Sequence, residues 1–173
     1  MATSLYDISV ANYLQTVQAV SAFLKKGLAF SREKGTGTDG IVECRLFPDM
    51  LPFRFQIVSV AHHSLGAIEG LKTGVFTSPS QAEPLDYSAL QNLIAATIDG
   101  LRQLSPSEVN AFEGGDVVFQ VRDRQIPFTA ENFILSFSLP NFYFHATTAY
   151  DILRTKGVAL GKRDFLGQLR LKG

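Results

Sequence analysis

The segment from Thr129 to Gly157 constrains the fold of this chain more than any other, because it has the pattern of one long helix. Thr129 can cap its start, Glu131 lies in the first turn, and Gly157 follows two basic residues at its end. About 27 residues at about 1.5 Å each give a rod of roughly 40 Å, which crosses a small domain from end to end. We therefore expect the rest of the chain to pack along this rod.

Two neighbouring faces of this predicted helix differ in character. The face expected to be buried consists of Leu135, Leu139, Phe142, Ala146, Ala149 and Leu153. The more polar face beside it consists of Ile134, Ser138, Asn141, His145, Thr148 and Ile152. At about 100° per residue, His145 borders the core instead of pointing into water. Pro140 lacks an N–H, so we expect a kink or loosened turn just before Asn141 and His145.

Three further long helices are predicted at residues 7–34, 53–72 and 86–104, because apolar side chains recur there at helical spacing. The period then changes to that of a strand, which predicts a hairpin at residues 117–121 and 125–128. A short helix is expected at residues 41–46, another turn of helix after Ser105, and a loop at residues 77–84. The predicted fold is mainly α, an up-and-down four-helix bundle with a small β-hairpin before the last helix, in a single domain over residues 1–173.

Composition excludes several classes of function. The formal net charge is zero, which argues against nucleic acid as the main partner because phosphate binding needs a concentrated positive field. No apolar run approaches the roughly 20 residues of a membrane helix, and the N-terminal residues lack the pattern of a secretory signal. Cys44 is the sole cysteine, which fits a reducing compartment. We therefore expect a cytoplasmic protein that binds neither nucleic acid nor membrane.

The candidate site joins the last helix to the second. His145 and Asn141 are the candidate catalytic residues, and Gln56 and His63 are the candidate binding residues on the second helix. His63 falls on the edge of the apolar face, whereas His62 is expected to point roughly the opposite way, towards solvent. His145 has three readings: a histidine satisfied by structural hydrogen bonds, an acid or base in a metal-free polar pocket, or a metal ligand.

Several segments carry a resemblance to a known family. SLYDISV near the start, RLFPDMLP at residues 45–52, Gln56, and LPNFYFHATTAYDILRTKGVALGKRDFLG at residues 139–167 are similar to the uncharacterised bacterial and fungal branch of the DinB-like superfamily. The resemblance runs along nearly the whole chain. It implies a four-helix bundle that is often a homodimer, in a superfamily that includes metal-dependent thiol transferases and many members of unknown activity.

The resemblance also implies where a metal would lie. In metal-binding relatives, one histidine comes from the second helix and two more, four residues apart, come from the last helix ahead of an arginine. His145, nine residues before Arg154, matches the second of that pair, and Asn141 stands where the first would be. The second-helix ligand would be His63 or His62. The resemblance implies His145 and His63 as the metal ligands, and the metal would be a divalent transition metal. The alternative is that the protein has no cofactor.

Two functions of different kinds follow. The first is a bundle enzyme of small-molecule metabolism, with a pocket between the second and last helices that holds a small-molecule ligand against His145. The second is a non-catalytic homodimer that acts as a binding or structural module through its apolar helix faces. The sequence does not identify a substrate or a reaction.

Overall fold

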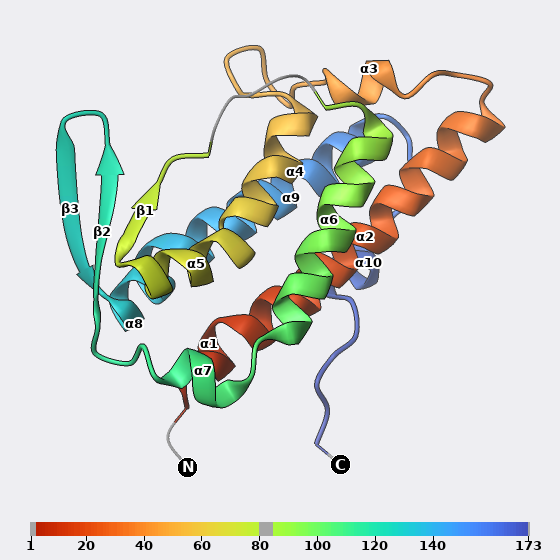
Figure 1. Cartoon of the computed structure of the whole chain (residues 1–173). Helices are drawn as coiled ribbons and strands as arrows, with labels where there is room; N and C mark the ends of the chain where they lie inside the picture. The colour runs from red at the N-terminus through yellow and green to blue at the C-terminus, as the bar shows by residue number, and fades with distance from the viewer. Residues whose placement is uncertain (1–2, 80–84, 173) are drawn as a thin grey trace.

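Four helical rods surround one apolar core in the computed structural model, which describes residues 3–79 and 85–172 (Figure 1). The first rod is α2 (Val10–Glu33), and the second consists of α4 (Phe53–His62) followed by α5 (Leu65–Thr73). The third rod is α6 (Tyr87–Gln103), and the fourth ends in α9 (Leu139–Thr155). The predicted four-helix bundle is therefore confirmed.

The rods do not alternate strictly in direction along the chain. Figure 1 shows α2 and α9 running one way and both α4–α5 and α6 running the other. The first and second rods are therefore antiparallel, and so are the third and fourth, whereas the second and third rods run in the same direction. In the packing, α2 contacts α6 and α9, and α4 contacts the same two helices. The last rod therefore lies directly against the second, as the candidate site requires.

Side-chain caps define where several helices begin. Asp86 accepts a hydrogen bond from the Ala89 N–H at the start of α6, and Ser105 and Glu108 form a capping box at α7 (Pro106–Asn110), as predicted. The first helix begins earlier than expected, because Ser4 caps a separate α1 (Leu5–Ile8) that ends at Ser9. The predicted helix at residues 41–46 is instead α3 (Asp39–Val42).

The second rod is broken beside the candidate site. The helix predicted over residues 53–72 ends at His62 and resumes at Leu65. At the break, the Ser64 hydroxyl donates to the carbonyls of Val60 and Ala61, a local bond that competes with regular helix pairing. The regular 100° spacing assumed for the two histidines therefore stops at this point.

A three-stranded sheet closes one end of the bundle (Figure 1). The predicted hairpin is confirmed and slightly longer, with β2 (Asp116–Val121) antiparallel to β3 (Arg124–Thr129). A further strand, β1 (Val75–Thr77), pairs with β2 in parallel and was not predicted. Only its last residue, Thr77, belongs to the segment expected to be a loop, residues 77–84, of which 80–84 lie outside the described residues. The strand directs Phe76 into the core.

The last rod is one helical path with a widened section. Thr129 caps α8 (Ala130–Asn132) as predicted, η1 (Phe133–Ser138) is a π-helix, and α9 follows with Pro140 in its first turn. The loosened turn expected near Pro140 is thus a π-helix that ends just before it. Leu135 was predicted to be buried but is 52% exposed, because the wider turn rotates it out of phase with the buried positions that follow.

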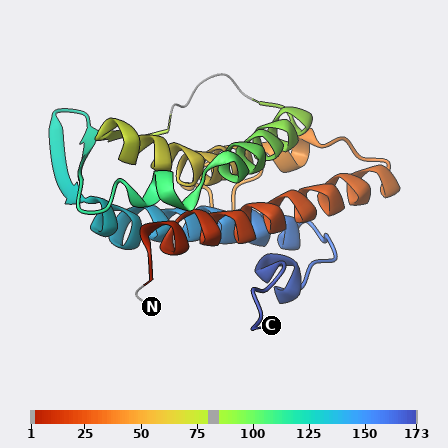
Figure 2. The same ribbon diagram turned by 60° about the horizontal axis from the view of Figure 1, so that its bottom comes forward.

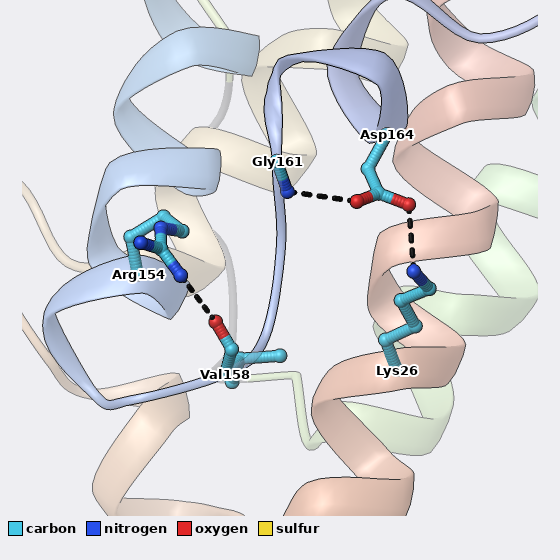
Figure 3. Close-up of polar contacts among 5 residues, drawn as sticks. All are labelled: Lys26, Arg154, Val158, Gly161 and Asp164. Carbon is cyan, nitrogen blue, oxygen red and sulfur yellow. Dashed lines mark hydrogen bonds and ion pairs between the residues drawn. The ribbon is translucent and has the colours of Figure 1, made fainter.

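The C-terminal segment packs against the outside of α2 (Figure 2). Val158 and Leu160 are buried, as predicted, and α10 (Lys162–Leu166) follows, with Leu166 exposed. Figure 3 shows the polar contacts: the Lys26 ammonium lies 2.7 Å from the Asp164 carboxylate, which also accepts from the Gly161 N–H at 2.8 Å. No helix among the described residues is both long and apolar enough to span a membrane.

Candidate functional site

His145 on α9 and Gln56 on α4 form a direct polar contact across the bundle. The distance from His145 Nδ1 to Gln56 Oε1 is 2.7 Å, and the Gln56 side chain is only 2% exposed. The Gln56 Nε2 donates to the Leu51 carbonyl at 2.8 Å, so its Oε1 must act as the acceptor. His145 Nδ1 therefore carries the proton, and Nε2 keeps its lone pair.

His63 lies beside His145 in the same region. The two imidazole rings are nearly parallel, 19° apart, with centroids separated by 5.8 Å. His63 is 4% exposed, and its Nδ1 has no hydrogen-bond partner among the described residues. A buried nitrogen without a partner is uncommon and marks a place where a ligand atom can gain a hydrogen bond.

A buried pair of hydroxyls fixes the backbone of His63. Ser138, the last residue of the π-helix, donates from Oγ to the His63 carbonyl at 2.7 Å. Because that hydroxyl proton is used, the Tyr13 hydroxyl donates to Ser138 Oγ, also at 2.7 Å. Three rods thereby meet at the break after α4, where the two hydroxyls hold the backbone at His63.

Asn141 forms a hydrogen bond within its own helix and lies at the wall of the cavity described next. Its Nδ2 donates to the Phe137 carbonyl at 2.7 Å, one turn earlier, in the section that Pro140 leaves short of a backbone donor. The hydrogen-bond partner of His145 is thus Gln56 and not Asn141.

A cavity of about 360 Å³ brings most of these residues together. Its lining comes from the second rod, from β1 and the two residues that follow β1, from β2, and from the last rod. The lining residues are Phe55, His63, Phe76, Ser78, Pro79, Phe119, Phe137, Asn141 and His145. The aromatic rings are in mutual contact, with Phe119 and Phe137 centroids 4.6 Å apart. We call this cavity the histidine pocket.

Burial keeps both pocket histidines uncharged. It lowers the pKa of His145 to about 4. It also lowers the pKa of His63 to about 3, with smaller contributions from the neighbouring His62 and His145. Desolvation disfavours the charged imidazolium, so at neutral pH both rings offer a nitrogen lone pair. The arrangement suits accepting a hydrogen bond on a neutral nitrogen, and the lowered pKa values make each ring a weaker base than a free imidazole.

Comparison with known proteins agrees with this architecture. Residues 5–166 match the family described as "Domain of unknown function (DUF1993)". The chain belongs to the DUF1993 family. A search of curated protein sequences returns no significant match. Among solved structures, the chain is similar to a DinB family member protein from Shewanella denitrificans, with 26% sequence identity, a TM-score of 0.83, and 98% of this chain and 95% of that chain covered. The resemblance to DinB-like proteins is thus confirmed.

The three-histidine metal site of DinB-like relatives does not fit this DUF1993 member. Among the described residues, no group of three histidine, cysteine or acidic side chains lies close enough to hold an ion. His63 and His145 are two nitrogen ligands, and the third position is taken by Asn141, a weak oxygen donor. The matching arginine, Arg154, donates to the Val158 carbonyl at 3.1 Å and holds the chain end instead (Figure 3).

The remaining histidine is closer to the pocket than its predicted direction implies. His62 Nε2 lies 2.7 Å from the Thr77 carbonyl, and its ring centroid is 5.6 Å from that of His63. Both rings contact Phe76, at 4.5 and 5.4 Å between centroids. His62 is half-buried and is not part of the pocket lining. It therefore supports β1 from outside the pocket.

Sequence reasoning missed the aromatic walls and the hydroxyl pair of this DUF1993 domain. Phe119 sits in the predicted strand segment DVVFQV, whose alternation places it on one face of the sheet, and that signal was available. Phe76 lies in a three-residue strand too short to be recognised. Nothing in the sequence pairs Tyr13 with Ser138, which are 125 residues apart.

Proposed function

We propose that this protein is an enzyme of small-molecule metabolism in which His145 accepts a proton from a substrate held in the histidine pocket. The observation that carries the proposal is the 2.7 Å bond between His145 Nδ1 and Gln56 Oε1. This bond holds the imidazole in the tautomer whose Nε2 lone pair is available. Its lowered pKa keeps that lone pair unprotonated at neutral pH.

The other residues have supporting roles in this proposal. Gln56 positions the ring of His145, and Asn141 and His63 offer polar atoms to orient the bound molecule. The phenylalanine walls exclude water and bind the apolar part of the substrate. The volume of about 360 Å³ is within the range of small-molecule sites. The substrate is therefore a small, partly apolar molecule with a readily ionised O–H or N–H group, because a base of lowered pKa does not remove a weakly acidic proton.

The test is a ligand screen followed by variants. A metabolite library is screened by ligand-observed NMR against the wild-type protein, and the compounds that bind are incubated with it to detect turnover. We expect His145→Ala to lose turnover while keeping the wild-type circular dichroism spectrum. Asn92→Ala is the control, because Asn92 is an exposed residue of α6 outside the pocket lining, and this variant should retain turnover. Equal turnover by wild type and His145→Ala would overturn the assigned role.

A metal version of this site has its own test. His63 and His145 are two ligands of the incomplete set discussed above, and no step of the proposal passes through an ion. Elemental analysis of the purified protein measures the metal content directly. A stoichiometric transition metal that disappears in His63→Ala and His145→Ala would show that this pair holds it with further ligands.

A second candidate function is a non-catalytic homodimeric module. Large apolar side chains are exposed on α9, where Phe144 is 55% exposed next to Tyr143, and in the turn before α4, where Phe47 is 64% exposed. Exposed aromatic residues are typical of protein interfaces. Light scattering at micromolar concentration is expected to give about twice the chain mass of 19.0 kDa, and Phe144→Asp to reduce it. A monomeric wild-type protein would remove this alternative.

A further inference from the structure

A second cavity lies at the end of the bundle away from the sheet. Its volume is about 410 Å³, and its lining comes from the end of α2, the residue after α9, the segment between α2 and α3, and α3 itself. Figure 1 shows that α2 and α9 both end on the side of the bundle opposite the sheet. The cavity lining consists of Phe30, Ser31, Lys34, Thr36, Gly37, Gly40, Ile41 and Lys156. None of these residues lines the histidine pocket. We call it the lysine cavity.

Two positive charges from different elements line the lysine cavity. Lys34 follows α2, and its ammonium lies 5.9 Å from the centroid of the Phe30 ring. Lys156 follows α9. Ion pairs among the described residues involve Lys26, Arg54 and Arg102, so neither cavity lysine has an acidic partner within 4.0 Å there. The acidic neighbours Glu33 and Asp39 are exposed and do not line the cavity.

The helix ends do not supply the missing partner. Helix C-termini carry partial negative charge on unpaired carbonyls, which attract lysine. At the end of α2, however, Thr36 N–H donates to the Ser31 carbonyl at 2.9 Å, and Gly35 takes φ +65°. At the end of α9, Val158 N–H donates to the Leu153 carbonyl at 3.0 Å, and Gly157 takes φ +92°. These turns pair the Ser31 and Leu153 carbonyls within the chain, and among the described residues neither the Lys34 nor the Lys156 ammonium has a hydrogen bond or an ion pair.

A buried hydroxyl provides an independent sign of a ligand. Ser31 is 1% exposed, lines the lysine cavity, and its Oγ has no hydrogen-bond partner among the described residues. A helical serine usually satisfies its hydroxyl on the carbonyl one turn earlier. An unpaired buried hydroxyl is costly unless a bound group completes it.

The base of the cavity is apolar. Ile41 is buried, and Phe30 presents its ring below the Lys34 ammonium. A Cβ atom added at Gly40 or Gly37 would meet no other atom within 4 Å, so the loop side is open. The cavity therefore combines two cations and one hydroxyl with an apolar surface.

We propose that the lysine cavity binds a small organic anion, with a carboxylate or phosphate group between Lys34 and Lys156 and an apolar body against Phe30 and Ile41. The anionic group accepts a hydrogen bond from Ser31 Oγ. The two charges attract the anion, and the apolar base distinguishes an organic anion from a bare inorganic one. This site is separate from the histidine pocket and does not depend on the function proposed there.

The test uses phenyl phosphate as the probe, titrated into the full-length protein and followed by amide chemical shifts. We expect saturable shifts at residues 34–41 and at Lys156 and Gly157, and none at the histidine pocket. Inorganic phosphate and benzyl alcohol are the matched probes, each with one half of the recognised chemistry, and each should bind more weakly. Equal binding of inorganic phosphate would overturn the role of the apolar base, and equal binding of benzyl alcohol would overturn the role of the lysines.

Variants assign the effect to the named residues. Lys34→Met with Lys156→Met removes both charges and keeps most of the side-chain length, and it should weaken phenyl phosphate binding by about fivefold or more. Lys25→Met removes a lysine of α2 that lies outside the cavity, and it should bind as the wild type does. Unchanged affinity in the double variant, or absence of saturable shifts in the wild type, would overturn the proposal.

Discussion

The histidine pocket and the lysine cavity have similar volumes but are built in opposite ways. In the histidine pocket, polar side chains come from the middle of rods and are held by buried partners: Gln56 holds His145, and Ser138 holds the backbone of His63. In the lysine cavity, the polar groups come from helix ends and a loop, and among the described residues Ser31 Oγ has no hydrogen-bond partner and the two lysines form no ion pair. The first site is preorganised and uncharged, whereas the second is charged and is completed only by a ligand. Changes at the first should therefore act on stability, and changes at the second on binding.

The largest expected difference between the two sites is in the response to acid. The folded pKa values of His63 and His145 lie below the ordinary value of 6.5, so the unfolded chain binds protons more readily than the folded one. The stability they contribute is complete above about pH 6.5 and is lost as the pH falls towards their folded values. From pH 7 to pH 5, the loss is about 2 kcal/mol for each histidine.

Urea unfolding at both pH values measures this loss. The difference in unfolding free energy between the wild type and His63→Gln/His145→Gln should shrink by about 4 kcal/mol at pH 5, because other titrating groups cancel in the comparison. Lys34→Met should keep the pH dependence of the wild type. A difference that is the same at both pH values would mean that the two imidazoles are not buried in neutral form.

The next largest effect is expected from the hydroxyl pair. Ser138→Ala leaves the fully buried Tyr13 hydroxyl and the His63 carbonyl without their partner, which should reduce the unfolding free energy by about 2 kcal/mol. Ser136→Ala is a matched control, because the Ser136 hydroxyl bonds to the Asn132 carbonyl on the exposed side of the same π-helix. It should change stability by less than about 0.5 kcal/mol. Similar losses in both variants would show that the serine bonds are equivalent.

A smaller and more specific effect is expected from the partner of His145. Gln56→Glu places a carboxylate at 2.7 Å from Nδ1, and a negative neighbour favours the imidazolium. The pKa of His145 should rise by more than about one unit, as measured by NMR titration of its ring carbons. Gln125→Glu, on the exposed strand β3, should leave that pKa unchanged. An unchanged His145 in Gln56→Glu would contradict the assigned hydrogen bond.

The smallest effect on stability is expected in the lysine cavity. Ser31→Ala removes an unpaired buried hydroxyl, so the unfolding free energy should stay equal or rise by up to about 1 kcal/mol. Ser59→Ala removes a second such hydroxyl, on α4 and outside both cavities, and should behave alike in stability. Phenyl phosphate binding should weaken only in Ser31→Ala. A clear loss of stability in Ser31→Ala would show that this hydroxyl already has a partner in the folded protein.

Most of the bundle could be predicted from periodicity, because its rods are amphipathic and their caps are local signals. Asp86, Ser105 and Thr129 each cap the helix that they were expected to cap. The same spacing also predicted that Gln56, His63 and His145 share a polar region between the second and last rods. The structure places His145 against both Gln56 and His63, and the chemical role of the three residues remains a proposal.

The errors occur where the regular spacing is interrupted. Leu135 lies in the π-helix, where a wheel of about 100° per residue no longer holds. His62 and His63 stand at the end of α4, so the opposite directions expected within one continuous helix do not apply. β1 depends on pairing with β2, which follows about forty residues later, and no local pattern encodes such a long-range contact. Likewise, no local pattern in the sequence predicts that the Ser31 hydroxyl is buried without a hydrogen-bond partner among the described residues.

The π-helix also separates two parts of the last rod that must stay aligned. Its six residues, Phe133–Ser138, lie between the β2–β3 hairpin, which carries Phe119, and α9, which carries His145. Because a π turn takes one more residue than an α turn, removing one residue there would restore regular α-geometry with little change in the alignment of the parts on either side. Removing one residue from α9 between Leu139 and His145 would instead rotate the two parts by about 100° relative to each other, so that the sheet and the imidazole would face different sides of the bundle. A single-residue deletion should therefore be tolerated better within the π-helix than in the regular helix that follows it.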